Sequence, residues 1–257
     1  MNTTSYPSDL TDSQWSKLQE ILQDTRKRKW EFSQILNAIF YLVKGGIQWR
    51  MLPKDMPPWQ TVYYYFRKWK QDGTWDLILE ELRLLGRKQA GRAPSPSIGL
   101  IDSQSVKSSF LGGERGFDAG KKVKGIKRQI VVDTLGLLLA IVVHRADLSD
   151  KQGGEFVLRR LAKNALCFPR LVKFYADQAY KSLEKTIRKI NPRWKTEIIK
   201  RPKGTKGFVL LPKRWIVERT FAWLEYSRRL DKNYERIAST HETMAKIAMI
   251  RIIIRRF

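Results

Sequence analysis

Cysteine and histidine are nearly absent from this sequence of 257 residues, which contains only Cys167, His144 and His241. A single cysteine cannot form an internal disulfide, and one thiol with two imidazoles is too few for a tetrahedral zinc site. A catalytic metal ion, if the chain uses one, must therefore be held by carboxylates.

Long hydrophobic runs are also missing. The longest, residues 135–143, is far shorter than the roughly 20 apolar residues of a membrane-spanning helix, and it predicts a buried strand instead. Residues 1–10 lack the basic and then apolar pattern of a signal peptide. We therefore expect a cytoplasmic protein with no membrane partner.

Acidic residues are scarce relative to basic ones. The chain has 25 Asp and Glu against 50 Lys and Arg, which gives a formal net charge of +25. This charge exceeds what solubility requires, and its spread among apolar residues from Arg26 to Arg256 predicts charged faces on folded elements. Nucleic acid is the partner we expect; a ribosomal-type or membrane-surface protein is the alternative.

Residues 1–88 carry helical patterns. A capping box at Thr11 opens the first helix, apolar residues recur at helical spacing over 31–43, and further helices are predicted over 59–70 and 75–85. A helix, a tight turn and a second helix dense in aromatic and basic residues are typical of a helix-turn-helix DNA-binding domain. A plain helical bundle is the alternative.

The helix predicted over 59–70 has two kinds of side chain. Val62, Phe66 and Trp69 share one stripe and should form core. The aromatic and basic residues off this stripe are the expected DNA contacts: Tyr63, Tyr64, Arg67, Lys68 and Lys70.

Residues 86–97 are rich in Gly, Pro, Ser and basic residues and predict a linker, placed at 89–97, to an α/β domain over 98–257. Asp133 to Gly136 predicts a hairpin turn between antiparallel strands, with parallel strands following. The expected strands are 98–101, 129–132, 137–144, 171–176 and 196–199, with helices from Ser149, over 183–190, and two long ones at the C-terminus.

Three carboxylates carry the candidate chemistry. Asp102 and Asp177 each end an apolar strand, and Glu218 flanks the packing stripe of a C-terminal helix. Alone, each could be a cap or an ion-pair partner. Together they could hold two Mg²⁺ or Mn²⁺ ions about 4 Å apart, which suits nuclease and strand-transfer chemistry.

Three segments, residues 101–107, 176–180 and 214–224, closely resemble the motifs of DDE transposases of the insertion-sequence-five group. The resemblance extends to residues 45–50 and 128–136, and so covers nearly the whole chain. It implies a ribonuclease-H-like fold with Asp102, Asp177 and Glu218 as catalytic metal ligands.

Related transposases often have a Tyr, Arg, Glu, Lys pattern around the last carboxylate. Arg214 fits the Arg and is expected to grip DNA phosphates, whereas Leu211 and Glu225 occupy the Tyr and Lys positions. A basic, glycine-containing loop beside Asp102 suits the DNA backbone, although a merely solvated loop is the alternative. Its expected DNA contacts are Lys107, Lys122, Lys124 and Arg128, near Lys121 and Lys127.

The resemblance implies an enzyme that binds the terminal inverted repeats of its own element, cuts there and joins the ends to target DNA. Two ends must be processed together, so a homodimer or larger synaptic complex on double-stranded DNA, at the nucleoid, is expected. A ribonuclease-H-like nuclease such as a junction resolvase, or a DNA-binding regulator with relict carboxylates, are the alternatives.

Overall fold

A computed structural model of the chain describes residues 6–23, 26–110, 112–199 and 213–257. The chain divides into two compact units. The first comprises Met1–Gly86, Leu224–Asp231 and Thr243–Phe257, and the second comprises Arg87–Trp223 and Lys232–Glu242. Part of the C-terminal helical segment thus belongs to the same unit as the N-terminal helices. The expected division into domains at 1–88 and 98–257 stays a prediction.

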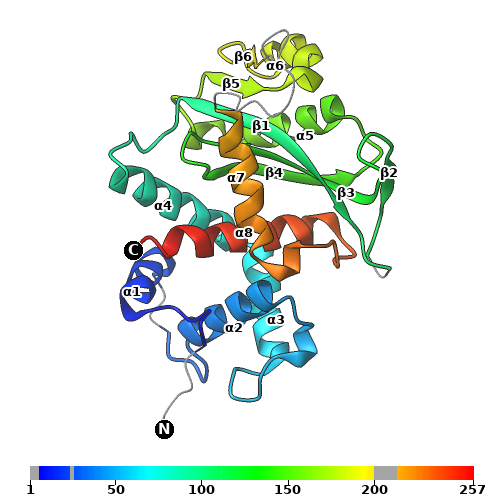
Figure 1. Cartoon of the computed structure of the whole chain (residues 1–257). Helices are drawn as coiled ribbons and strands as arrows, with labels where there is room; N and C mark the ends of the chain where they lie inside the picture. Colours follow the sequence, from blue (N-terminus) through cyan, green and yellow to red (C-terminus); the bar gives the residue numbers. More distant parts are fainter. Residues whose placement is uncertain (1–5, 24–25, 111, 200–212) are drawn as a thin grey trace. The chain divides into compact units, whose positions relative to one another are not determined.

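Helices build the first unit (Figure 1). They are α1 (Asp12–Leu22), α2 (Phe32–Gly45), α3 (Trp59–Gln71), α4 (Thr74–Gln89, ending at the start of the expected linker) and most of α8 (Ala238–Ile254), with 3-10 turns at Trp49–Met51 and Arg228–Leu230. The predicted capping box at Thr11 is confirmed, and Gly46, at φ 74°, ends α2 in the left-handed conformation that favours glycine.

The core of the first unit follows the predicted stripes. Val62, Phe66 and Trp69 are buried as expected, and the Trp75 indole donates a hydrogen bond to the Phe66 carbonyl at 3.2 Å. The C-terminal helix α8 is apolar on nearly all sides, as a buried helix should be, and most of its residues from Met244 to Ile254 are buried.

The second unit contains a six-stranded mixed sheet. Its strands are β1 (Ile98–Lys107), β2 (Gly116–Asp118), β3 (Val123–Val132), β4 (Leu138–Arg145), β5 (Lys173–Ala176) and β6 (Lys195–Ile198). The order is β2-β3-β1-β5-β6, and β4 pairs with β3. The predicted antiparallel hairpin β3–β4 is confirmed, as are parallel strands following it at β1–β5 and β5–β6.

Helices flank this sheet, so the α/β prediction is confirmed (Figure 1). Helix α5 (Asp150–Lys163) starts at the predicted capping box of Ser149 and packs its apolar side on a cluster that includes Ile101 and Phe174. Helix α6 (Glu184–Ile190) follows a 3-10 segment at Gln178–Leu183, and helix α7 (Arg214–Glu225) follows Lys213.

The hairpin turn after β3 is stabilised by the carboxylate of Asp133. The Asp133 carboxylate accepts hydrogen bonds from the amides of Leu135 and Leu137 at 2.9 Å each, and it forms a buried ion pair with Arg87. Nothing in the local sequence pattern links Arg87 to Asp133, which is 46 residues away.

The expected basic loop beside Asp102 is the main correction to the sequence-based fold. Lys107 ends β1, and Lys124, Lys127 and Arg128 lie in β3, so four of the six basic residues assigned to the loop are on strands. Strands β1 and β3 continue beyond their predicted ends at 101 and 129 as an antiparallel pair as far as Lys107 and Gly125. Asp102 therefore lies within β1 and does not end its strand as predicted.

Candidate active site

Asp102 and Asp177 lie side by side because of strand register. In the parallel pairing of β1 with β5, Leu100 is opposite Tyr175. Each aspartate comes two residues later on its own chain, and residues two apart point to the same face. The two carboxylates therefore leave the sheet together, on the face opposite to Ile101 and α5.

Burial makes Asp102 an unusual carboxylate. Desolvation is the main cause that raises the pKa of Asp102 from 3.8 to about 6, and the negative charge of Asp177 adds to it. The backbone amide of Ser103 bonds to the Asp102 carboxylate at 2.7 Å, and this bond, with the charges of Arg214 and Lys121, opposes the shift. A cation close to the Asp102 and Asp177 carboxylates would favour their ionised forms.

Asp177 is held at the end of β5 by a cap. Its carboxylate accepts a hydrogen bond from the Ala179 amide at 2.9 Å, at the start of the 3-10 segment. The Asp177 side chain is one-quarter exposed, so it sits at the mouth of the site while Asp102 lies deeper.

Helix α7 brings Glu218 toward the two aspartates through Arg214. The Arg214 guanidinium lies 3.3 Å from the Glu218 carboxylate, one turn along the helix, and 3.8 Å from the Asp177 carboxylate. Arg214 is thus a cation between two of the three predicted metal ligands, and its charge lowers the pKa of the third, Asp102.

The start of α7 and its middle are both tied to the sheet. The Lys213 ammonium donates to the Tyr175 hydroxyl on β5 at 2.6 Å. The buried Thr220 hydroxyl donates to the Gly136 carbonyl at 3.0 Å, and Arg219 donates to the Leu135 carbonyl at 3.0 Å. The β3–β4 turn therefore sets the position from which Glu218 projects.

The donor chemistry of this site fits a hard divalent cation, because Asp102, Asp177 and Glu218 offer only oxygen ligands and Asp102 lacks a full counter-charge. Among the described residues, no three His, Cys, Asp or Glu side chains are already arranged around one metal position. The Arg214 guanidinium lies beside both Asp177 and Glu218.

The α3 residues predicted to bind DNA lie mostly at the surface. Tyr63 and Tyr64 are 36% and 58% exposed, Arg67 lies over the Tyr63 ring, and Lys68 forms an ion pair with Asp72. Lys70 is half-buried. Four of the five side chains are thus exposed, and their contact with DNA stays a prediction.

The remaining predicted DNA contacts divide into two groups. Lys107, Lys122 and Lys124 are exposed. Arg128 is only 1% exposed, because β3 places it inside the sheet opposite Gln104 of β1. The prediction that Arg128 contacts a phosphate is therefore wrong, because the Arg128 side chain is not accessible to DNA.

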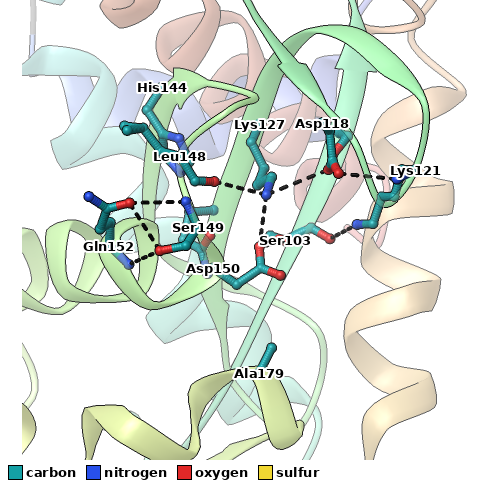
Figure 2. Close-up of polar contacts among 12 residues, drawn as sticks. Ser103, Asp118, Lys121, Lys127, His144, Leu148, Ser149, Asp150, Gln152 and Ala179 are labelled. Atoms are coloured by element: carbon teal, nitrogen blue, oxygen red, sulfur yellow. Dashed lines mark hydrogen bonds and ion pairs between the residues drawn. The ribbon is translucent and has the colours of Figure 1, made fainter.

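A buried polar cluster behind Asp102 was missed by sequence analysis (Figure 2). Lys127 on β3 is 5% exposed, and its ammonium lies 3.5 Å from Asp118 and 3.3 Å from Asp150. Lys127 lies opposite Ser105 at an inward position of β3. This position follows from the register of β1 with β3, which the sequence alone does not give.

Two sequence features lie outside the described residues. Leu211, at the position of the family Tyr, is one of them. The basic segment 200–207, most of whose side chains are Lys, Arg or Gly, is the other.

Comparison with known proteins gives consistent matches. Residues 93–253 match the family described as the transposase DDE domain, and residues 10–79 match the family described as a putative transposase of the IS4/5 family. A putative transposase for insertion sequence element IS402 from Burkholderia cepacia is 35% identical over 129 residues. That match covers 48% of this chain and 60% of the relative.

Proposed function

The chain belongs to the DDE transposase family, and from this membership we propose that it cuts DNA at the terminal inverted repeats of its insertion sequence and transfers the freed ends to target DNA. The observation that supports this proposal most directly is the register that sets Asp102 beside Asp177, together with Arg214, which pairs with both Asp177 and Glu218. The family implies that this sheet is ribonuclease-H-like.

We assign Asp102, Asp177 and Glu218 as the ligands of Mg²⁺ or Mn²⁺, with two ions expected. Ions bound there supply an activated water or 3′-hydroxyl and stabilise the leaving oxygen of an in-line displacement at phosphorus. Asp102 provides a half-buried, rigid oxygen donor from a strand, whereas the 51% exposed Glu218 side chain can adjust its position.

Arg214 forms ion pairs with both Asp177 and Glu218. Its side chain is 37% exposed, so the guanidinium can turn toward solvent without unfolding α7. In that position it would face a DNA phosphate beside the carboxylates, which agrees with the role implied by the family pattern.

The exposed face of α3 is the proposed site that recognises the element ends. Tyr63, Tyr64 and Arg67 form a contiguous aromatic and basic surface, a composition that suits both base edges and phosphates. Synapsis of two ends by a homodimer or larger complex is part of the same proposal.

Cleavage of a labelled duplex that carries the flanking inverted repeat tests the assignment. With Mg²⁺, wild type should nick at the repeat end, while Asp102→Asn, Asp177→Asn and Glu218→Gln should bind the duplex and lose cutting by more than about a hundredfold. Asp147→Asn is the matched control, because Asp147 is a carboxylate whose ion pair is with Arg145 at the surface. Full cutting by any triad variant would remove that residue from the assignment.

A further inference from the structure

Lys127 is a buried cation with three acceptors around it. Its ammonium donates to the Leu148 carbonyl at 3.0 Å and lies between the carboxylates of Asp118 and Asp150. A buried ammonium is costly unless each of its protons is matched in this way. The four residues come from β3, β2, the first turn of α5 and the segment before it, so Lys127 ties these segments together.

Both carboxylates around Lys127 also bind strand β1. The Ser103 hydroxyl donates to Asp150 at 2.6 Å, and the Ser105 hydroxyl donates to Asp118 at 2.5 Å. Burial alone would raise the pKa of Asp118, but the bonds from Ser105 and the Lys121 amide, with the charges of Lys127 and Lys121, lower it. Asp118 is therefore held as an ionised acceptor.

Ser103 connects this network to the proposed active site. Its side chain points to the α5 face, whereas its backbone amide bonds to the carboxylate of Asp102 on the other face. Its carbonyl accepts a hydrogen bond from the Lys121 ammonium at 3.3 Å, and the Lys121 amide in turn bonds to Asp118 at 3.1 Å. Figure 2 shows Lys127, Ser103 and Lys121 arranged around this part of β1.

We propose that Lys127 is a positioning residue: by holding Asp118 and Asp150 together, it fixes Ser103 and Lys121 against β1 and thereby orients the carboxylate of Asp102. The inference rests on the proposed role of Asp102 as a metal ligand. Groups that orient a metal ligand through hydrogen bonds typically change metal affinity or activity by about 10- to 100-fold when they are removed.

Two variants test the two ends of this network. Lys127→Met keeps much of the side-chain length and removes the charge, and Ser103→Ala removes the link to Asp150. Each should weaken Mn²⁺ binding to the DNA-free protein, measured by electron paramagnetic resonance of free Mn²⁺, by about tenfold or more. Each should slow single-turnover cutting similarly, with the affinity for the element end unchanged within about twofold.

Rescue and coupling separate positioning from general stability. Ser103→Thr keeps the hydroxyl and should retain Mn²⁺ affinity and cutting. The double variant Lys127→Met with Ser103→Ala should lose little more than either single variant, because both act through one network. Arg160→Met is the matched control: Arg160 pairs with the buried carboxylate of Glu242 at 3.2 Å, in the same unit but outside this network.

Hydrogen exchange of the metal-free, DNA-free protein supplies a measurement that does not depend on the proposed function. Exchange over residues 101–107 and 118–124 should be faster in Lys127→Met than in wild type or Arg160→Met. Unchanged exchange there overturns the inference. The inference is also overturned if Lys127→Met shows faster exchange but keeps the Mn²⁺ affinity of wild type, because the network would then be purely structural. If wild type itself neither binds Mn²⁺ nor cuts, the proposed function fails, and this inference fails with it for a distinct, recognisable reason.

Discussion

At the scale of single residues, Asp102 shows what a buried carboxylate costs the fold. Its pKa is raised to about 6, so the folded chain prefers the protonated form more than the unfolded chain does. Ionisation therefore lowers the free energy of unfolding as pH rises from about 4 to about 6, and the full cost is present above that range. The carboxylate that we propose as a metal ligand is here a liability for stability.

Asp102→Asn should remove this cost. At pH 8 we expect the variant to be more stable than wild type by about 1–3 kcal/mol, the equivalent of the raised pKa, and at pH 4 the two should be equal. Urea unfolding at both pH values measures the difference. Asp147→Asn should show no gain at pH 8, because a hydrogen bond from Arg145 lowers the pKa of Asp147. An Asp102→Asn protein that is less stable than wild type at pH 8 would refute the argument.

At the scale of elements, the position of α7 depends on the β3–β4 turn. Gly136 adopts φ +82°, and a Cβ atom there would lie 2.8 Å from the Thr220 hydroxyl oxygen and 3.0 Å from the Trp223 ring. Thr220 and Trp223 belong to the helix that carries Glu218. A side chain at residue 136 would therefore push on α7 itself.

Gly136→Ala is expected to destabilise the protein by about 2–4 kcal/mol, because left-handed strain of about 1 kcal/mol adds to the clash with α7. It should also reduce cutting at the element end more than binding to it. Gly73→Ala is a matched control: Gly73 also has φ +82°, but a Cβ atom there meets nothing within 4 Å. It should show the strain alone. Thermal unfolding and single-turnover cutting of both variants give the comparison, and equal losses would mean that contact with α7 does not matter.

Local sequence patterns predicted the elements well and their polar contacts poorly. The capping boxes at Thr11 and Ser149 need only residues three apart, so they were visible in the sequence. The placement of Asp177 directly after β5 was equally visible, whereas Asp102 lies within β1 and not at its end as predicted. The inward orientation of Lys127 and Arg128 was not, because it depends on pairing with β1 over more than 20 residues of chain, and basic residues are usually at the surface.

At the scale of the whole molecule, charge dominates what the chain can bind. A net charge of +25 attracts any DNA, so tight binding alone cannot identify the residues that recognise the element ends. The exposed face of α3 offers two kinds of group, the ring surfaces of Tyr63 and Tyr64 and the cation of Arg67. These groups should respond differently to salt and to sequence.

Arg67→Ala should weaken binding to an element-end duplex and to a scrambled duplex alike, and should reduce the slope of log K against log salt concentration by about 0.9, as loss of one phosphate contact does. Tyr64→Ala should leave the slope unchanged and weaken only the element-end complex, because base contacts carry sequence discrimination. Fluorescence anisotropy over about 50–300 mM salt measures both. Arg188→Ala, which removes an exposed arginine paired with Glu184 on α6, is the control for charge alone. If all three variants behave alike, α3 is one more part of a generally basic surface, and end recognition must lie elsewhere on the chain.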